Sequence, residues 1–185
     1  MELLSSLPLF VARCCQALHT AGFQAYPVGG CVRDLLLSRT PQDWDVCTSA
    51  LPSQVQALFP HTVPTGLAYG TVTVVLEGGT VEVTTFRQED GYGDGRRPDA
   101  VSFVSSLEAD LSRRDFTINA MAMAPDGQLL DPFGGRGDLQ RRSVRCVGKP
   151  ELRFREDRLR MFRAIRFAAQ LDFQLEGQLL QALME

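Results

Sequence analysis

A glycine pair and two closely spaced acidic residues lie near the start of the chain. The sequence Gly29-Gly30-Cys31-Val32-Arg33-Asp34 is followed after a short interval by Asp43-Trp44-Asp45. Two carboxylates two residues apart on a strand point to the same face, and their oxygens suit Mg²⁺. A glycine turn followed by an arginine suits close approach to a phosphate. Either feature alone is also typical of an ordinary turn or a solvated loop, but the ordered combination predicts nucleotidyl transfer with two metal ions.

The elements around these residues are predicted to position them. Residues 25–28 form a short strand that runs into the glycines, and residues 32–37 form a helix whose N-terminus faces the glycines. The free N–H groups and the dipole at a helix N-terminus favour a phosphate, and Arg33 in the first turn is placed to contact it. Asp43 is predicted to open the next strand, which ends near Cys47.

A β-hairpin follows, in which residues 71–76 and 80–86 alternate between apolar and polar and are joined by Gly78-Gly79. In its second strand Glu82 lies on the face opposite Val81 and Val83. If this strand lies beside the one that carries the acidic pair, Glu82 becomes a third carboxylate. The alternative is a solvent-facing glutamate on a half-exposed strand.

The segment 88–98 has three glycines, mixed charge and almost no apolar residue, which predicts a mobile loop. Its Arg96-Arg97 pair would contact RNA or simply be solvated. Further on, Ser106 is predicted to begin a helix that leads to Arg113-Arg114-Asp115. A turn is predicted at 125–127 and another at 131–135.

Residues 154–170 are predicted to form one helix, whose buried stripe consists of Phe154, Met161, Ile165 and Ala168. Charged residues recur at every third position of this helix, namely Asp157, Arg160, Arg163 and Arg166. At 3.6 residues per turn this ladder winds around the helix, so Asp157 and Arg160 share a pocket while Arg166 lies nearly opposite. A solvated, charge-laced helix is the alternative. Another helix starts within 172–185 and stops in mid-pattern, which is typical of a fragment boundary rather than of a domain end.

Composition bounds the class of protein. The chain has 185 residues, of which 44% are hydrophobic, which is enough for one domain or a domain and a half. No apolar run approaches the length of a membrane span, and the N-terminus lacks the layout of a signal peptide. Five cysteines without a Cys-x-x-Cys pair and two histidines argue against zinc and predict reduced thiols in the cytoplasm.

Charge is unevenly distributed along the chain. The net charge is −3, but residues 136–166 alone carry 11 basic and 4 acidic side chains. Such a basic block indicates a polyanion partner. Eighteen of the 19 cationic residues are arginines, which bind phosphate bidentately. A genome whose codons favour arginine would explain that bias equally well.

Taken in order, these segments resemble the class II tRNA nucleotidyltransferase / poly(A) polymerase family, which comprises the bacterial CCA-adding enzymes and their relatives. The resemblance covers about Val28 to Phe173. It is carried by the motifs GGCVRD with DWD, VEVTTFR, DLSRRDFTINAMA, DPFGG and EDRLRMFRAIRFAAQL. Together these motifs are highly specific, although no single one is.

The resemblance implies an α+β fold, with a polymerase-beta-like nucleotidyltransferase head (a mixed sheet with flanking helices) over 1–148 and the start of a helical neck over 149–185. It implies Asp43 and Asp45 as catalytic ligands of Mg²⁺. It implies a nucleotide-binding set of Gly30, Arg33, Arg114, Asp157, Arg160, Arg163 and Arg166. The substrates would be CTP, ATP and the 3′ end of tRNA, with Asp157 and Arg160 reading the base as a protein template and no protein partner or membrane implied.

The chain departs from the family in extent, because the helical body and tail domains that hold tRNA are missing, as is the His-Asp phosphohydrolase domain of some relatives. The segment 88–98 looks complete, which favours addition of CCA or of the terminal A over addition of CC alone. A bacterial poly(A) polymerase of the same family is an alternative function. A non-catalytic nucleotide- or RNA-binding module is another, but it would require loss of a catalytic carboxylate, and both are present.

Overall fold

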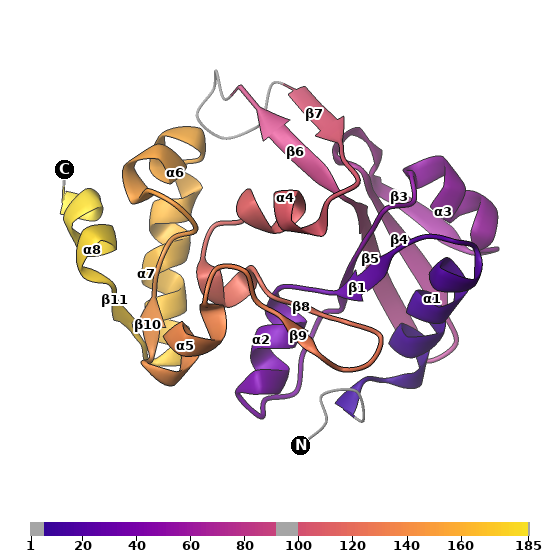
Figure 1. Cartoon of the computed structure of the whole chain (residues 1–185), viewed down its shortest axis with the longest axis horizontal. Coiled ribbons are helices and arrows are strands. Elements are labelled where there is room, and N and C mark those ends of the chain that lie inside the picture. Colours follow the sequence, from indigo (N-terminus) through magenta and orange to yellow (C-terminus); the bar gives the residue numbers. More distant parts are fainter. Residues whose placement is uncertain (1–5, 92–99, 185) are drawn as a thin grey trace.

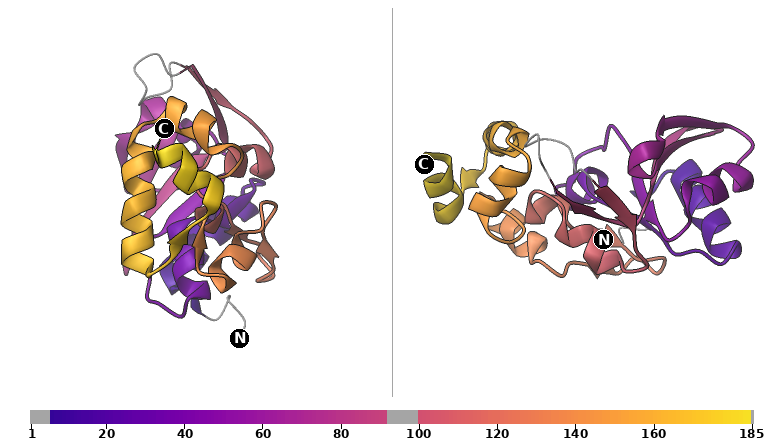
Figure 2. Two further views of the ribbon diagram at one scale, coloured as in Figure 1. Left: turned by 90° about the vertical axis from the view of Figure 1, so that its left-hand side faces the viewer. Right: turned by 90° about the horizontal axis from the view of Figure 1, so that it is seen from above.

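The computed structural model describes residues 6–91 and 100–184. It is an elongated α+β structure (Figure 1) in which a five-stranded sheet and its covering helices occupy one end and three C-terminal helices the other. The view from above in Figure 2 shows the same separation. The predicted fold class is therefore confirmed.

The sheet has the strand order β1-β2-β5-β4-β3. Its strands are β1 (Ala25–Pro27), β2 (Asp45–Thr48), β3 (Thr62–Gly66), β4 (Thr71–Leu76) and β5 (Gly79–Thr85). The β2–β5 pair is parallel and the other pairs are antiparallel, so the sheet is mixed. The predicted hairpin is confirmed, and Gly78 at its turn has a φ of 100°, a conformation that glycine adopts without steric cost.

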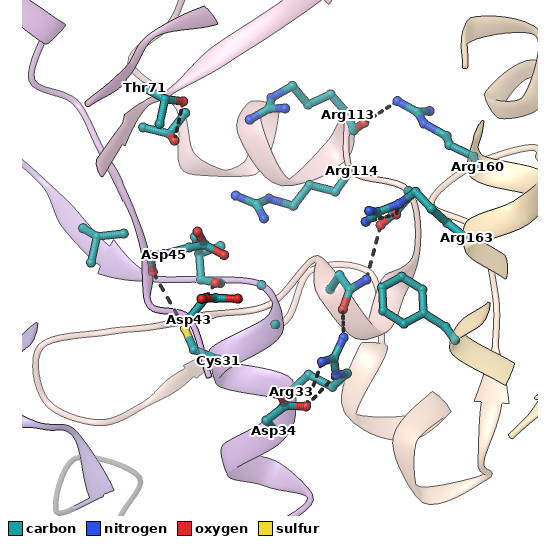
Figure 3. A pocket seen from close by; sticks show the side chains of 18 of the residues that line it. Cys31, Arg33, Asp34, Asp43, Asp45, Thr71, Arg113, Arg114, Arg160 and Arg163 are labelled. Atoms are coloured by element: carbon teal, nitrogen blue, oxygen red, sulfur yellow. Dashed lines mark hydrogen bonds and ion pairs between the residues drawn. The ribbon is translucent and has the colours of Figure 1, made fainter. Parts of the chain in front are cut away.

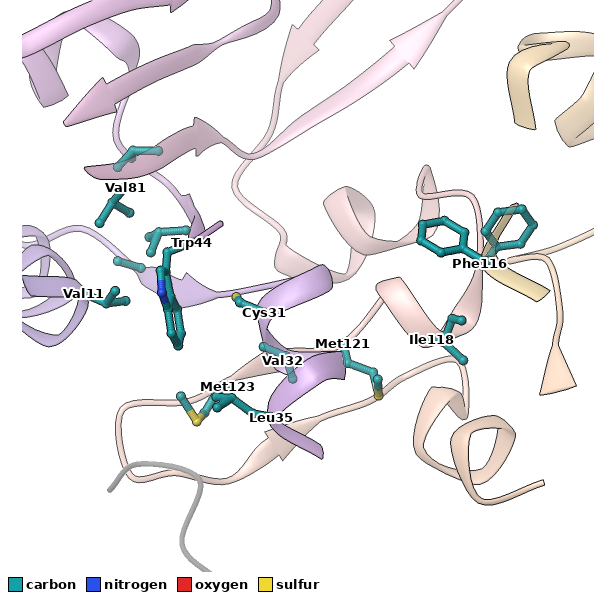
Figure 4. Packing of buried hydrophobic residues seen from close by; sticks show 14 of the residues in the cluster. Val11, Cys31, Val32, Leu35, Trp44, Val81, Phe116, Ile118, Met121 and Met123 are labelled. Carbon is teal, nitrogen blue, oxygen red and sulfur yellow. The ribbon is translucent and has the colours of Figure 1, made fainter. Parts of the chain in front are cut away.

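One face of the sheet is apolar and covered. Val46, Val81 and Val83 are fully buried there, against α1 (Leu9–Thr20) and α3 (Pro52–Leu58). Figure 4 shows Trp44 in the same core as residues of α2 (Gly30–Leu36). Burying each such side chain contributes about 1.5–3 kcal/mol. Because side chains alternate along a strand, this burial directs Asp45 and Glu82 to the opposite, open face.

A second set of short elements connects the sheet to the C-terminal helices. It consists of β6 (Arg87–Asp90), β7 (Ala100–Phe103), α4 (Leu107–Ser112), η3 (Thr117–Asn119), β8 (Ala122–Met123), β9 (Leu129–Leu130), α5 (Gly135–Gln140) and β10 (Ser143–Val144), whereas η2 (Leu67–Tyr69) joins β3 to β4 within the sheet. The helix predicted after Ser106 is confirmed, since the Ser106 hydroxyl caps it by accepting from the Ala109 N–H.

The segment predicted as a loop over 88–98 is wrong at its start. Residues 88–90 belong to β6, which pairs antiparallel with β7. Backbone hydrogen bonds hold this ribbon, so the polar side chains that suggested a loop do not prevent a strand. Residues 92–99, including the Arg96-Arg97 pair, lie outside the described residues.

The C-terminal helices are α6 (Pro150–Glu156), α7 (Leu159–Leu171) and α8 (Gly177–Met184), with β11 (Gln174–Leu175) paired in parallel to β10. The single helix predicted over 154–170 is therefore wrong. The chain turns extended at Asp157, where φ is −143°, and the Asp157 carboxylate accepts the Leu159 N–H at 2.9 Å. An aspartate that caps a new helix in this way ends the preceding one.

This break also shifts the buried face of the last long helix. The buried residues of α7 are Arg160, Ala164, Phe167 and Leu171. Ile165 was predicted to pack on the domain, but its side chain is 55% exposed. The prediction failed because it carried one helical phase across the break at Asp157.

All five cysteines are free and buried, as expected for reduced thiols. Burial raises the pKa of Cys14, Cys15 and Cys146 to about 12 and that of Cys31 to about 11. Among residues 6–91 and 100–184, no helix is both long and apolar enough to span a bilayer.

Candidate active site

A cavity of about 870 Å³ lies between the open face of the sheet and the C-terminal helices. Its walls come from the start of α2, from β2, from the residues that follow α4 and from α7. Figure 3 shows acidic side chains on the sheet side and arginines on the other. The lining includes most of the predicted site residues, namely Gly30, Arg33, Asp43, Asp45, Arg114, Asp157, Arg160 and Arg163.

The glycine turn brings the backbone of α2 to the cavity. Gly29 has φ 81° and ψ −130°, a conformation that is essentially restricted to glycine. A Cβ atom on Gly29 would lie 2.9 Å from the Arg114 guanidinium. Gly30 then opens α2, so the unpaired N–H groups of its first turn lie at the cavity wall. Gly29 is therefore needed both for its backbone conformation and for the space that Arg114 occupies.

The acidic residues gather at the edge where β2 begins. Asp45 is the first residue of β2, while Asp43 precedes the strand and does not open it as predicted. Trp44 between them is 8% exposed and fills the core, which leaves both carboxylates to line the cavity. Glu82 is paired with Asp45 across the parallel β2–β5 ladder, so it lies on the same face of the sheet.

The pKa of Asp45 reflects both its burial and its charged neighbours. Burial raises its pKa to about 6, and the carboxylates of Glu82 and Asp43 add to the increase, although the Arg114 guanidinium opposes it. Glu82 therefore acts on Asp45 as the third-carboxylate hypothesis expects, but its side chain is exposed and does not line the cavity, as the solvent-facing alternative expects. Within the described part of the chain, however, no group of three or more His, Cys, Asp or Glu residues has the arrangement of a metal site.

Arg114 lies between the acidic group and a buried carboxylate. Its Nη2 donates to Asp110 at 3.3 Å, and the attraction of Asp110, Cys47 and Asp45 outweighs burial and raises the Arg114 pKa. Burial pushes the pKa of Asp110 upward, but the Arg114 and Arg113 guanidinium groups more than offset it and the pKa is lowered. The Nε of Arg114 is buried and has no hydrogen-bond partner among the described residues.

Arg33 projects from α2 into the cavity (Figure 3). Its Nε donates to Asp34 at 2.8 Å and its Nη1 donates to Asn119 at 2.8 Å. Asn119 also donates to Asp115 at 3.4 Å. A side chain held at both ends of its guanidinium has little rotational freedom left to lose when it binds an anion.

The base-selecting pair predicted from the sequence lines the same cavity but is not ion-paired with itself. Asp157 uses one carboxylate oxygen to cap α7. Arg160 is 6% exposed and donates to Glu156 at 2.6 Å and to the Arg113 carbonyl at 3.2 Å. The second Asp157 oxygen and the remaining Arg160 N–H groups are the groups that a base would meet.

The last two arginines of the ladder, Arg163 and Arg166, differ in whether they line the cavity. Arg163 lines the cavity and donates to Asp115 at 2.6 Å. Arg166 does not line the cavity, so its predicted place in the nucleotide site is not supported by the lining. Its guanidinium lies 5.3 Å from the ring of Phe167, a cavity residue.

Sequence reasoning missed three residues that hold the arginines in place, namely Asp110, Asn119 and Phe167. Asp110 binds Arg114, Asn119 binds Arg33, and Phe167 contacts three guanidinium groups. Asn119 carried a usable signal, because it is one of two polar residues in the otherwise apolar segment 116–123. Asp110 and Phe167 looked like ordinary helix residues.

A mixed sheet that presents two carboxylates beside a glycine turn, facing a wall of arginines, defines the head domain of a nucleotidyltransferase. The family described as the poly A polymerase head domain matches residues 25–145. The chain therefore belongs to the class II tRNA nucleotidyltransferase / poly(A) polymerase family.

Individual relatives narrow the comparison. The CCA-adding enzyme of Lactobacillus delbrueckii subsp. bulgaricus is 54% identical over 169 residues, which are 91% of this chain and 43% of the relative. The crystal structure of the Bacillus stearothermophilus CCA-adding enzyme in complex with CTP matches with 51% identity and a TM-score of 0.85, covering 92% of this chain and 41% of that one. The crystal structure of a tRNA nucleotidyltransferase complexed with a primer tRNA and an incoming ATP analog matches with 32% identity and a TM-score of 0.74. The match covers 92% of this chain and 48% of that one. The chain thus spans less than half the length of the proteins it matches.

Proposed function

We propose that this chain is the head (1–148) and the start of the neck (149–185) of a cytoplasmic tRNA nucleotidyltransferase. The enzyme transfers CMP and AMP from CTP and ATP to the 3′ end of tRNA, completing CCA or adding its terminal A, and releases pyrophosphate. The names and ligands of the relatives support this assignment. A poly(A) polymerase of the same family is the second candidate, favoured by the family to which the head domain is matched.

The observation that carries the proposal is the shared cavity. Asp43 and Asp45 occupy one wall, Arg33 and Arg114 lie beside them, and Asp157 and Arg160 occupy the opposite wall. Nucleotidyl transfer requires a site for the reacting phosphate, a site for the leaving pyrophosphate and a site for the base. These three pairs supply one each, within about 870 Å³.

The acidic pair fits Mg²⁺ on the chemistry of its donors. Asp43 and Asp45 offer hard oxygen ligands. Burial raises the pKa of Asp45 to about 6, and the carboxylates of Glu82 and Asp43 add to this against the opposing Arg114 guanidinium, so a further cation beside Asp45 would be favourable. Two carboxylates are sufficient, because Mg²⁺ in such sites keeps coordination positions for substrate phosphates. When bound, Mg²⁺ would activate the RNA 3′-hydroxyl and neutralise the triphosphate. At neutral pH the Asp45 carboxylate is ionised and available as a ligand, because its pKa lies below 7.

The arginines bind and orient the triphosphate in this proposal. Arg33 is restrained by Asp34 and Asn119 and directs its guanidinium toward the phosphates. Arg114, which lines the same cavity and whose Nη1 lies beside Gly29, contributes a second guanidinium. The N–H groups at the start of α2, from Gly30 onward, add neutral donors.

The base is selected by hydrogen bonding to the template pair. The free oxygen of Asp157 accepts from the amino group of cytosine or adenine, and Arg160 donates to the ring acceptors. Uracil and guanine present a carbonyl where that amino group should be, which leaves the carboxylate facing an acceptor. The contacts of Arg160 with Glu156 and the Arg113 carbonyl fix its direction, as a template requires.

The test uses the full-length protein, Mg²⁺, labelled CTP or ATP, and tRNAs that end before CCA, after C and after CC. Stepwise completion of all three substrates indicates CCA addition, whereas extension of only the tRNA that ends in CC indicates addition of the terminal A. Extension by many A residues indicates a poly(A) polymerase. Binding of nucleotide without any incorporation would refute the proposal and favour a non-catalytic binding module.

A further inference from the structure

Phe167 is an apolar residue among the charged side chains that line the cavity. It lies on α7, is 8% exposed and lines the cavity. Its ring packs edge-to-face on Phe116, with the centroids 5.8 Å apart. Three guanidinium groups surround the same ring, since the Cζ atoms of Arg33, Arg163 and Arg166 lie 5.2, 5.3 and 5.3 Å from its centroid.

Hydrogen bonds also join two of these arginines through Asn119 and Asp115. Arg33 donates to Asn119, Asn119 donates to Asp115, and Asp115 accepts from Arg163. Figure 3 shows Arg33 rising from α2 and Arg163 reaching in from the C-terminal helices toward this chain of contacts. The Phe167 ring contacts the same two arginines directly. One aromatic ring therefore holds Arg33 of α2 and Arg163 of α7.

Charge explains why an aromatic ring suits this position better than a carboxylate. Arg33 is ion-paired with Asp34 and Arg163 with Asp115, while Arg166 forms no ion pair with any carboxylate in residues 6–91 and 100–184. Three cations thus meet two anions. The face of a phenyl ring attracts a guanidinium without neutralising it, so the charge of Arg166 adds to the positive potential around Arg33 and Arg163, the two arginines of this group that line the cavity. A carboxylate at position 167 would cancel that charge.

We propose that Phe167 is a positioning residue that fixes Arg33 and Arg163 through cation–π contacts and leaves them charged for the nucleoside triphosphate. This inference rests on the proposed function, because it concerns how the same cavity binds its nucleotide. It assigns to Phe167 an effect on triphosphate affinity that is common to CTP and ATP. Base choice, which we attribute to Asp157 and Arg160, should not depend on Phe167.

The test compares variants that change the ring in graded steps in the full-length enzyme. Phe167→Leu removes the ring and should raise KM for CTP and for ATP by the same factor, about 3- to 30-fold, with kcat changed by less than about twofold. Phe167→Tyr retains the ring and should stay near wild type. Replacement by mono-, di- and trifluorophenylalanine weakens the negative face of the ring at nearly constant volume, so KM should rise step by step.

Phe162→Leu is the matched control, because Phe162 lies on the same helix, is 71% exposed and does not line the cavity. It should leave KM unchanged. A Phe167→Leu enzyme with wild-type KM would overturn the proposal. So would a raised KM in Phe167→Leu together with wild-type KM across the fluorinated series, since that pattern shows packing rather than a cation–π effect.

Equilibrium binding of CTP, followed by calorimetry on the same proteins, separates this inference from the proposed function. Wild-type protein that binds CTP but extends no tRNA refutes the proposed function, and the Kd values of the fluorinated series still test Phe167. Wild-type protein that binds neither CTP nor ATP overturns both. The selectivity for CTP over UTP is a further readout, and a change in it on fluorination would contradict the role assigned to Phe167.

Discussion

Replacing Asp45 by Asn is expected to make the protein more stable while abolishing nucleotide transfer. Burial, opposed by Arg114 and assisted by Glu82 and Asp43, raises the Asp45 pKa from 3.8 to about 6. Folding at neutral pH therefore places a carboxylate where its charge is disfavoured. A shift of about two units corresponds to about 3 kcal/mol. Asn carries no charge, so the free energy of unfolding of Asp45→Asn should exceed that of wild type by up to about 3 kcal/mol without divalent cations.

The raised pKa also predicts how the stability difference between wild type and Asp45→Asn changes with pH. Below pH 3.8 Asp45 is protonated in both the unfolded and the folded chain, and wild type and variant should be equally stable. Between pH 3.8 and about 6 the unfolded chain releases this proton before the folded one does, so wild type loses stability relative to the variant. Above that window the difference should be constant.

Thermal unfolding in EDTA between about pH 4 and pH 8 measures the effect. For a chain of this size the full difference corresponds to a Tm higher by about 6–12 °C in the variant at neutral pH. Glu77→Gln, which removes an exposed carboxylate in the turn between β4 and β5, should not reproduce it. Mg²⁺ should raise the Tm of wild type and leave Asp45→Asn unchanged. A variant that is less stable than wild type at neutral pH, or a difference independent of pH, would refute the reasoning.

Three further predictions concern the same cavity. Asp43→Ala should abolish incorporation of CMP and AMP while circular dichroism and Tm report an intact fold; wild-type rates would contradict the metal-ligand role. Asp157→Ala should lower the preference for CTP and ATP over UTP and GTP by about tenfold to a few hundredfold, whereas Arg33→Ala should weaken binding of all four alike; competition assays with the four nucleotides distinguish these outcomes. Gly29→Ala should cost about 1–3 kcal/mol of stability and displace the Arg114 guanidinium, which a Cβ atom would approach to 2.9 Å. Chemical denaturation and CTP incorporation would measure both effects, and a variant with wild-type stability would show that the turn tolerates a side chain.

The sequence was sufficient to predict those elements that local residue patterns determine by themselves. Alternation around Val81 and Val83 predicted the strand and its buried face, and the glycines at 78 and 79 predicted the hairpin. The register that sets Glu82 beside Asp45 was only conditional, because a parallel pair has no connecting turn to fix it. The resemblance brought Asp43, Asp45, Arg33 and Arg114 into one site, and the cavity contains them.

The sequence was insufficient where a single side chain changes the local geometry. At Asp157 the helical pattern continues on both sides, and only the carboxylate that caps Leu159 reveals the break. Ile165 was misplaced for that reason. Asp110, Asn119 and Phe167 were missed for a different reason, because each acts through a side-chain contact that depends on the folded structure. Asn119 and Phe167, for example, both contact Arg33, which is distant in the sequence. No spacing rule encodes such contacts.

The five buried cysteines allow local unfolding of the chain to be measured by their reaction with thiol reagents. Alkylating reagents attack the thiolate, and burial that raises the thiol pKa suppresses that form until the surrounding element opens. Cys14 and Cys15 report on α1, Cys31 on α2, Cys47 on β2 and Cys146 on the segment after β10. Pulsed labelling and peptide mass spectrometry would therefore rank the order in which these elements open, and would show which of them nucleotide binding closes, without any engineered probe.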